Sequence, residues 1–264
     1  MNDLLQVHRA WRLQRVGEQL FVSGGIDATY LLDELQGDAL ARFLQAWDTD
    51  TLSRWPDLPR HGALIDKLVT LGALFRPVDA RTSPPVVGLR WAGAACPPFA
   101  QALQAAASSG DAPAWRLSDG AVADITLVVR TDAPMLATSQ QSTDIDGPHL
   151  LVDLAHHETV VVGPFVVPGQ TACLGCLAGR MSHLWGDPPP APEPAMLSRS
   201  VLMASLVAVH LDTFARCGSM PALVQHAWSL SLASWESHLH PVFLLPWCPL
   251  CQADAVGPAG IISF

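Results

Sequence analysis

Four of the six cysteines form two pairs in which two residues separate the thiols; the pairs are Cys173 with Cys176 and Cys248 with Cys251. Gly175 in the first pair and Pro249 in the second favour tight turns. Such a turn lets both thiolates of a pair reach one ion, and Zn²⁺ prefers four soft ligands in a tetrahedron. We therefore predict one zinc ion held by all four thiolates.

This zinc ion is expected to be structural, because four thiolates leave no coordination position open for a substrate. It would tie the second pair to a loop far upstream in the chain. Two independent redox motifs or four buried cysteines remain the alternatives, but the spacing favours metal where thiols stay reduced. The remaining two, Cys96 and Cys217, are interpreted as small core residues.

The stretch "RWAGAACPP" between a predicted strand and a predicted helix is where a nucleotide phosphate would bind. It holds one glycine, and its two prolines remove N–H donors at the start of the helix. Neither GxGxxG nor GxxxxGK[ST] occurs in the chain. Asp111 and Asp119 are candidates for ribose recognition by position only. We therefore expect no nucleotide and no catalytic residue here.

Four histidines are candidate bases or ligands, namely His156, His157, His238 and His240. No nucleophile or carboxylate constellation accompanies them in the sequence, which favours a surface or capping role.

Composition and charge limit the classes of protein to which the chain can belong. Half of the 264 residues are hydrophobic, 15% are charged, and the formal net charge is −9. That balance disfavours non-specific binding to nucleic acid or to an anionic membrane. No apolar run approaches the roughly 20 residues that cross a bilayer, and the first residues do not have the pattern of a signal peptide. We expect a cytoplasmic protein.

Residues 1–80 are predicted to form one compact module. Three strand-like runs lie at residues 11–16, 19–24 and 26–32, and helix-like patterns lie at 32–47, 48–55 and 60–78. In the last of these, apolar residues fall on one helical face, namely Leu64, Ile65, Leu68, Leu71 and Leu74, with Gly72 at its end. Three strands followed by three helices indicate a winged helix-turn-helix.

Residues 85–264 are predicted to form a second domain, after the polar break at residues 79–85. Strand candidates lie at 85–91, 112–118, 124–131, 149–169 and 222–246, and helix candidates lie at 92–109 and 197–218. A proline-rich loop is expected at residues 185–196. This alternation indicates an α/β fold with a Rossmann-type sheet.

The segments "VVGPFVVPGQTACLGCLAGR" and "PWCPLC" resemble the ThiF-like cyclodehydratase partner proteins of azole-forming peptide biosynthesis. These relatives of ubiquitin-activating enzymes accompany YcaO proteins in thiazole/oxazole-modified microcin and thiopeptide pathways. The resemblance covers nearly the whole chain, and its specific part couples Gly163 and the first cysteine pair to the second pair. The N-terminal module is similar to the peptide-recognition element of this family.

The resemblance implies a non-catalytic subunit that binds the leader of a ribosomal precursor peptide. It would present the core of that peptide to a separate YcaO cyclodehydratase, which uses ATP to form azolines. A flavin dehydrogenase of the same pathway and a second copy of this chain are further implied partners. The ThiF-like domain of most members has lost adenylation, and the broken glycine turn agrees with that loss.

An extended leader can add as another strand to the edge of the third strand in the module. The expected peptide-binding residues lie on this strand and on the helix beside it; they are Ala28, Thr29, Tyr30, Leu31, Arg60, Leu64, Lys67, Leu68 and Leu71. For Leu64, Leu68, Leu71 and Tyr30, a role in the core is the alternative.

Two other functions are alternatives. An active adenylating enzyme would need ATP and a carboxylate substrate, and the missing phosphate loop disfavours it. A winged-helix DNA-binding regulator would read bases with residues 61–76, which offer few basic or amide side chains.

Overall fold

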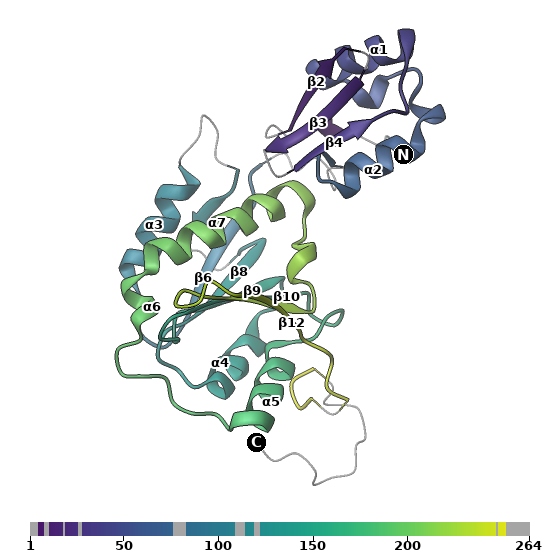
Figure 1. Cartoon of the computed structure of the whole chain (residues 1–264). Helices are drawn as coiled ribbons and strands as arrows, with labels where there is room; N and C mark the ends of the chain where they lie inside the picture. Colours follow the sequence, from purple (N-terminus) through teal and green to yellow (C-terminus); the bar gives the residue numbers. More distant parts are fainter. Residues whose placement is uncertain are drawn as a thin grey trace. The chain divides into compact units, whose positions relative to one another are not determined.

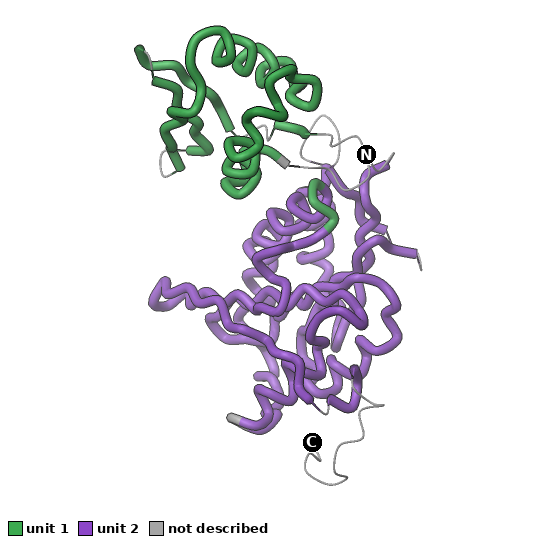
Figure 2. Tube along the Cα trace, turned by 90° about the vertical axis from the view of Figure 1, so that its right-hand side faces the viewer, with its two compact units in different colours: residues 1–80, 216–218 green, residues 81–215, 219–264 purple. Residues whose placement is uncertain are grey.

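The computed structural model describes residues 5–7, 11–17, 19–25, 28–75, 83–108, 114–118, 122–246 and 248–251. The chain divides into two compact units (Figure 2). Unit 1 comprises residues 1–80 with 216–218, and unit 2 comprises residues 81–215 with 219–264. Asp111 and Asp119 lie outside the described residues, as do residues 79–82 of the predicted break.

Unit 1 combines two small sheets with helices. Its elements are β1 (Gln6–Val7), β2 (Arg12–Val16), β3 (Gln19–Gly25), β4 (Ala28–Leu32), α1 (Gly37–Asp48), η1 (Leu52–Arg54), η2 (Leu58–Arg60), α2 (Gly62–Thr70) and β5 (Leu74–Phe75). The antiparallel three-stranded sheet has the order β2–β3–β4, and β1 pairs separately with β5. β4 is therefore an edge strand.

The core of unit 1 follows from the periodicity of its elements. Leu20 and Val22 alternate along β3 and are buried, because successive strand residues face opposite sides. Phe43 on α1 and Leu64 and Leu68 on α2 belong to the same hydrophobic cluster. Helical spacing places the buried side chains of each helix on one face.

Two predictions for unit 1 need correction. The second predicted helix is instead the short 3₁₀ turn η1, and a further 3₁₀ turn, η2, precedes α2. The third predicted helix is α2, which ends at Thr70, and Gly72, predicted at its end, takes a positive φ of 77°. Leu74 consequently lies in β5, not on the helical face.

Unit 2 is built on a seven-stranded mixed sheet. Its elements are β6 (Val86–Ala92), α3 (Pro97–Ala107), β7 (Arg116–Ser118), β8 (Ile125–Arg130), α4 (Met135–Gln141), η3 (Ser142–Asp144), β9 (His149–Asp153), β10 (Thr159–Val166), α5 (Leu174–Trp185), α6 (Ala195–Ser198), α7 (Ser200–Cys217), η4 (Pro221–Leu223), β11 (His226–Ser231) and β12 (Ser237–Pro241). The strand order is β12–β11–β10–β9–β8–β6–β7. β7, β6, β8 and β9 pair in parallel, whereas β9 to β12 pair antiparallel.

Helices cover both faces of this sheet (Figure 1). One hydrophobic cluster joins the sheet to α3, α6 and α7 through residues such as Phe99, Met196 and Leu211. Another cluster joins the opposite face to α4 and α5 through Met135 and Leu174. The predicted α/β sheet is thus present, with a mixed rather than wholly parallel strand arrangement.

Several elements of unit 2 differ from the sequence-based expectation. α4 and α5 were not predicted, and α5 begins at the first cysteine pair. The long predicted helix is divided into α6 and α7, with Arg199 between them. α7 ends where predicted, because Gly218 takes a positive φ of 66°.

α7 is long and apolar enough, by length and composition alone, to span a membrane. Its buried residues, including Met203, Val207 and Leu211, belong to the core cluster of unit 2. A buried core helix of a globular domain passes the same test, so α7 is weak support for a membrane span.

Candidate metal centre and peptide-binding edge

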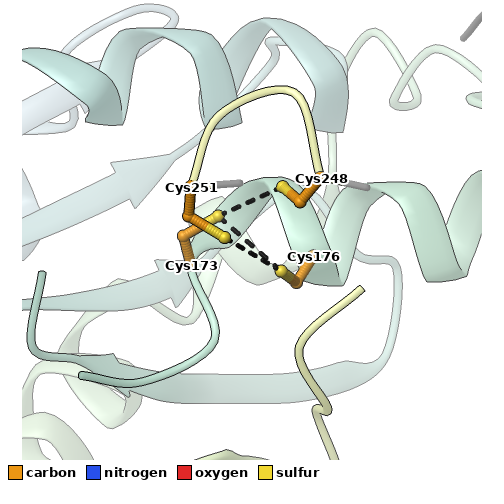
Figure 3. Close-up of side chains that lie close together, drawn as sticks. All are labelled: Cys173, Cys176, Cys248 and Cys251. Atoms are coloured by element: carbon orange, nitrogen blue, oxygen red, sulfur yellow. Dashed lines mark hydrogen bonds between the residues drawn. The ribbon is translucent and has the colours of Figure 1, made fainter. Parts of the chain in front are cut away.

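The four paired cysteines meet at one point in unit 2 (Figure 3). Cys173 is the N-cap residue of α5 and Cys176 lies in the first turn of that helix. Cys248 and Cys251 lie on the turn that follows β12, 75 residues further along the chain. The expectation of a tight turn is therefore wrong for the first pair, whose spacing is set by a helix start.

The sulfur atoms have the spacing of a tetrahedral metal site. Cys173 Sγ lies 3.8 Å from Cys176 Sγ and 3.6 Å from Cys248 Sγ, and Cys176 Sγ lies 3.5 Å from Cys251 Sγ. All four sulfur atoms lie within 4.8 Å of one another. A Zn–S bond of about 2.3 Å places tetrahedral ligands about 3.8 Å apart. The geometry thus suits one metal ion and is too open for disulfide bonds.

The backbone near the cysteines explains how the two segments approach. A Cβ atom added to Gly175 would lie 2.6 Å from Leu250 Cδ1 and 3.2 Å from Cys248 Sγ. Glycine at this position therefore leaves room for the Leu250 side chain and the second pair against the start of α5. The Leu245 N–H donates to Cys176 Sγ at 3.4 Å, a contact that favours the thiolate form.

Hydrogen bonds between the thiols shift the pKa of Cys173 and that of Cys248 in opposite directions. Hydrogen bonds with Cys176 and Cys248, together with burial, raise the pKa of Cys173. Hydrogen bonds from Cys173 and Cys176 lower the pKa of Cys248 to about 2. Four thiolates this close repel one another, so their joint deprotonation needs a bound cation. The α5 N-terminus adds favourable dipole charge at Cys173 and Cys176.

The edge strand β4 carries the first four predicted peptide-binding residues. Its only described sheet partner is β3, which leaves the outer row of its backbone groups without a ladder partner among the described residues. Tyr30 and Leu31 are 39% and 41% exposed. The Tyr30 ring stacks on Trp11 with centroids 6.1 Å apart, and Thr29 Oγ1 lies 3.1 Å from Ser23 Oγ.

The remaining predicted peptide-binding residues occupy different environments. Arg60 and Lys67 are exposed, and Leu71 is half-buried. Leu64 and Leu68 are 2% and 0% exposed and pack in the core of unit 1. Their side chains therefore offer no surface to a peptide, as the core alternative held. Sequence reasoning also missed Trp11 and Glu34, which lie beside Tyr30 and Lys67.

The turn after β6 is bonded to a carboxylate of the chain itself. Asp132 Oδ1 accepts a hydrogen bond from the Ala94 N–H at 2.8 Å and another from Thr131 Oγ1 at 3.1 Å. Gly93 has a φ of 109°, and a Cβ atom there would overlap Asp132 Oδ1. Pro97 and Pro98 occupy the first turn of α3. Phosphate would therefore meet a negative charge and few free N–H donors.

A buried ion cluster at the ends of β8 and β9 was missed by sequence reasoning. Asp153 Oδ2 accepts from Arg130 Nε and Nη2 at 3.0 and 2.9 Å and lies 3.1 Å from His156 Nε2. Burial opposes ionisation of Asp153, but His156 and Arg130 prevail and lower its pKa to about 2. His156 thus does have a carboxylate partner, three residues upstream.

A hydrogen bond between a histidine and a serine on neighbouring strands was also not predicted from the sequence. His240 Nε2 lies 2.8 Å from Ser229 Oγ across β11 and β12. The strand pairing that brings these residues together could not be read from either residue's neighbours in the sequence.

Solved structures share this fold. A heterocyclase "in complex with substrate and cofactor" and the heterocyclase TruD match 98% and 99% of this chain, with 17% and 18% identity and a TM-score of 0.56 each. This chain covers 42% and 45% of their lengths, so it spans less than half of each heterocyclase. The resemblance predicted from the sequence is confirmed at the level of the fold.

Structures of E. coli MccB match over nearly the whole length of both chains. The complex of MccB with MccA covers 94% of this chain and 99% of the MccB chain, with 13% identity and a TM-score of 0.55. A structure of MccB with ATP matches with 14% identity and the same TM-score. No protein-family model and no curated protein matches this chain.

Proposed function

We propose that this protein binds the leader segment of a ribosomally made precursor peptide and presents the peptide's core to a separate YcaO cyclodehydratase. The leader adds as a strand to β4, and the cyclodehydratase forms the azolines with ATP. In this proposal unit 1 is a winged-helix recognition element and unit 2 is a ThiF-type scaffold. The exposed edge of β4 is the observation that carries the proposal.

The edge of β4 has the properties that strand addition requires. Among the described residues its outer backbone groups have no ladder partner, and such groups supply affinity in strand-addition complexes. Tyr30 and Leu31 are exposed on opposite faces of the strand, so they can contact alternate side chains of an added peptide. Ala28 and Thr29 extend the same edge toward the turn after β3.

Residues beyond β4 set the rim of the proposed groove. Lys67 on α2 is bonded to Glu34, which lies two residues after β4, so α2 is adjacent to the end of the edge strand. Arg60 precedes α2 and is exposed, and Leu71 follows it and is half-buried. These residues offer positive charge and a limited apolar surface, while Leu64 and Leu68 hold α2 in place from the core.

Zinc is the proposed occupant of the four-cysteine site. Soft thiolate ligands in a tetrahedron select Zn²⁺ among the common divalent metals, and four thiolates complete its coordination. The ion would fix the segment after β12 to the start of α5. Its role is structural, because no position remains for a substrate.

The comparisons support the peptide partner. MccB was crystallised with MccA, and a heterocyclase of this fold was crystallised with its substrate. The assignment of cyclisation to a separate YcaO protein follows the family resemblance of the sequence. A flavin dehydrogenase of the pathway and a second copy of this chain are further proposed partners. We place the protein in the cytoplasm, where its thiols stay reduced.

An adenylating enzyme is the second candidate, because MccB of the same fold was crystallised with ATP. The Asp132 carboxylate at the turn after β6 disfavours it, since that group occupies the Ala94 N–H and repels phosphate. In the proposal the chain therefore binds no nucleotide and has no catalytic residue.

Reconstitution tests the proposed function. The precursor peptide and the YcaO protein would come from reading frames beside the one for this chain. We expect heterocycle formation, measured as loss of water by mass spectrometry, to require this protein and the leader together. Equal rates without this protein, or with a leaderless core peptide, would contradict the proposal.

A further inference from the structure

A cavity of about 410 Å³ lies in unit 2, between α5 and the sheet face formed by β9 to β12. None of the four paired cysteines lines it, and the proposed function does not use it. Its volume falls within the range of about 300–1,000 Å³ that is typical of small-molecule sites.

Most of the surface of the wall is apolar and comes from α5 and from strands of the sheet. Leu177 and Met181 face the cavity from α5, and Leu151, Val161 and Val242 face it from the sheet and the residue after β12. Val161 pairs with Asp153 on β9 and with Ser229 on β11, so these three side chains point to the same face. Such a wall favours the aliphatic or aromatic carbon of a ligand.

The polar part of the wall includes one carboxylate, whose charge is already paired. Asp153 is the one carboxylate among the described residues that line the cavity. Its Oδ2 bonds to Arg130 and His156, and its Oδ1 accepts from the Ala155 N–H at 3.0 Å. The negative charge of Asp153 is therefore balanced inside the protein.

A positively charged side chain, that of Arg180, lies at the rim of the cavity. Arg180 is exposed, lines the cavity, and has no ion pair among the described residues. Its guanidinium carbon lies 5.5 Å from the centre of the Phe243 ring, a cation–π contact that holds the group near the rim. The His240 ring also lines the wall, bonded to Ser229.

We propose that this cavity binds a small apolar anion, that is, an aliphatic or aromatic body with one carboxylate- or sulfonate-type head group. The carbon body occupies the apolar wall, and the head group accepts hydrogen bonds from the Arg180 guanidinium. The overall charge of −9 does not oppose this locally, because charges beyond about 8 Å are screened at physiological ionic strength.

The test uses the full chain and the fluorescent anion 1-anilinonaphthalene-8-sulfonate as probe. We expect one saturable site in a fluorescence titration. Val161→Phe fills the cavity from β10 and should weaken binding by at least about tenfold. Arg180→Gln removes the charge at an exposed position and should weaken binding by about tenfold. Leu239→Ser, on the opposite face of β12, is the matched control and should leave affinity unchanged.

Competition identifies the ligand class. Octanoate should displace the probe at much lower concentration than octanol, which has the same chain length without the charge. Equal competition by both, or binding that Arg180→Gln leaves intact, would overturn the anion assignment. Probe binding that survives in both cavity variants and is lost in Leu239→Ser would place the site elsewhere on the hairpin and refute the proposal. Because Arg180 is exposed, its variant folds and keeps the test decisive if Val161→Phe does not.

Discussion

Lys67 and Glu34 form an ion pair that joins α2 to the segment after β4, with Lys67 Nζ 2.9 Å from Glu34 Oε1. Burial opposes ionisation of Glu34, but the hydrogen bond and charge of Lys67 prevail and lower its pKa. Both side chains are exposed to more than a third of their surface. The pair therefore orients α2 and the segment after β4, which are two parts of the proposed groove. It contributes little to the free energy of unfolding.

Neutralising this pair should change stability only slightly. Lys67→Gln and Glu34→Gln are each expected to lower the free energy of unfolding by less than about 1 kcal/mol, because solvent screens exposed ion pairs. Urea unfolding measures the change. A loss of several kcal/mol would show that the pair is a main support of unit 1, contrary to its exposure.

Replacing Asp153 should have a much larger effect. Asp153→Asn leaves Arg130 buried without its counter-charge, and we expect a loss of about 3–5 kcal/mol in the free energy of unfolding at neutral pH. Both partners are buried, with side-chain exposures of 6% and 2%. The same urea experiment compares this variant with Glu34→Gln, which removes a carboxylate from an exposed pair.

The Asp153 cluster also predicts a pH dependence. The pKa of Asp153 is about 2 in the folded protein, below its value of about 3.9 in an unfolded chain. Its contribution is therefore complete above about pH 4 and is lost as the pH falls toward 2. The stability difference between wild type and Asp153→Asn should shrink over that interval. A constant difference from neutral pH to pH 2 would contradict the assignment.

Loss of one paired cysteine should remove the metal and destabilise unit 2. We expect one zinc ion per chain in the wild type by elemental analysis, and none in Cys173→Ser or Cys248→Ser, with loss of soluble protein. Acid should release the metal as the thiolates become protonated. Cys217→Ser is the control, because Cys217 lies outside the cluster. A soluble, folded and zinc-free Cys173→Ser protein would refute a structural metal.

ATP should neither stabilise the protein nor be turned over. A ligand that binds only the folded state raises the melting temperature, and millimolar ATP is expected to cause no such rise. ATP–pyrophosphate exchange should be absent. Asp132→Ala frees the Ala94 N–H, but Pro97 and Pro98 still deprive α3 of donors, so binding should not return. Exchange activity in the wild type would favour the adenylating alternative.

The cysteine cluster was predictable because residue type and spacing alone indicate a metal site. Two CxxC spacings in a chain with few cysteines imply a shared ion, whatever fold joins them. The local conformation was not predictable in the same way, and the first pair begins α5 instead of forming an isolated turn. Main strands such as β3 and β8 were found from their apolar pattern, whereas the two-residue strands β1 and β5 are too short to show a period.

The Asp153 cluster and the cavity were beyond sequence reasoning for a different reason. Asp153 and His156 are three residues apart, but their partner Arg130 lies on another strand. The cavity is lined by Leu177 on α5 and by Ser229 on β11. These residues are far apart in the sequence, and only the tertiary fold, including the strand order, brings them to one cavity. Similarly, Leu64 and Leu68 have the same helical spacing whether they face a groove or the core.

Leader binding by adjacent proline variants of β4 tests the central claim most directly. N–H groups of successive strand residues point to opposite sides, so one of Thr29 and Tyr30 bonds to β3 and the other faces the free edge. Proline at the free-edge position preserves the sheet and removes a donor for an added strand. Thr29→Val and Tyr30→Phe keep both N–H groups and serve as controls.

Fluorescence polarisation of a labelled leader with the full chain gives the affinity, and circular dichroism reports folding. We predict that one of the two proline variants, Thr29→Pro or Tyr30→Pro, folds like the wild type and binds the leader at least about tenfold more weakly. The two controls should bind with nearly wild-type affinity. Unchanged affinity in both proline variants, each fully folded, would show that the leader does not bind along β4.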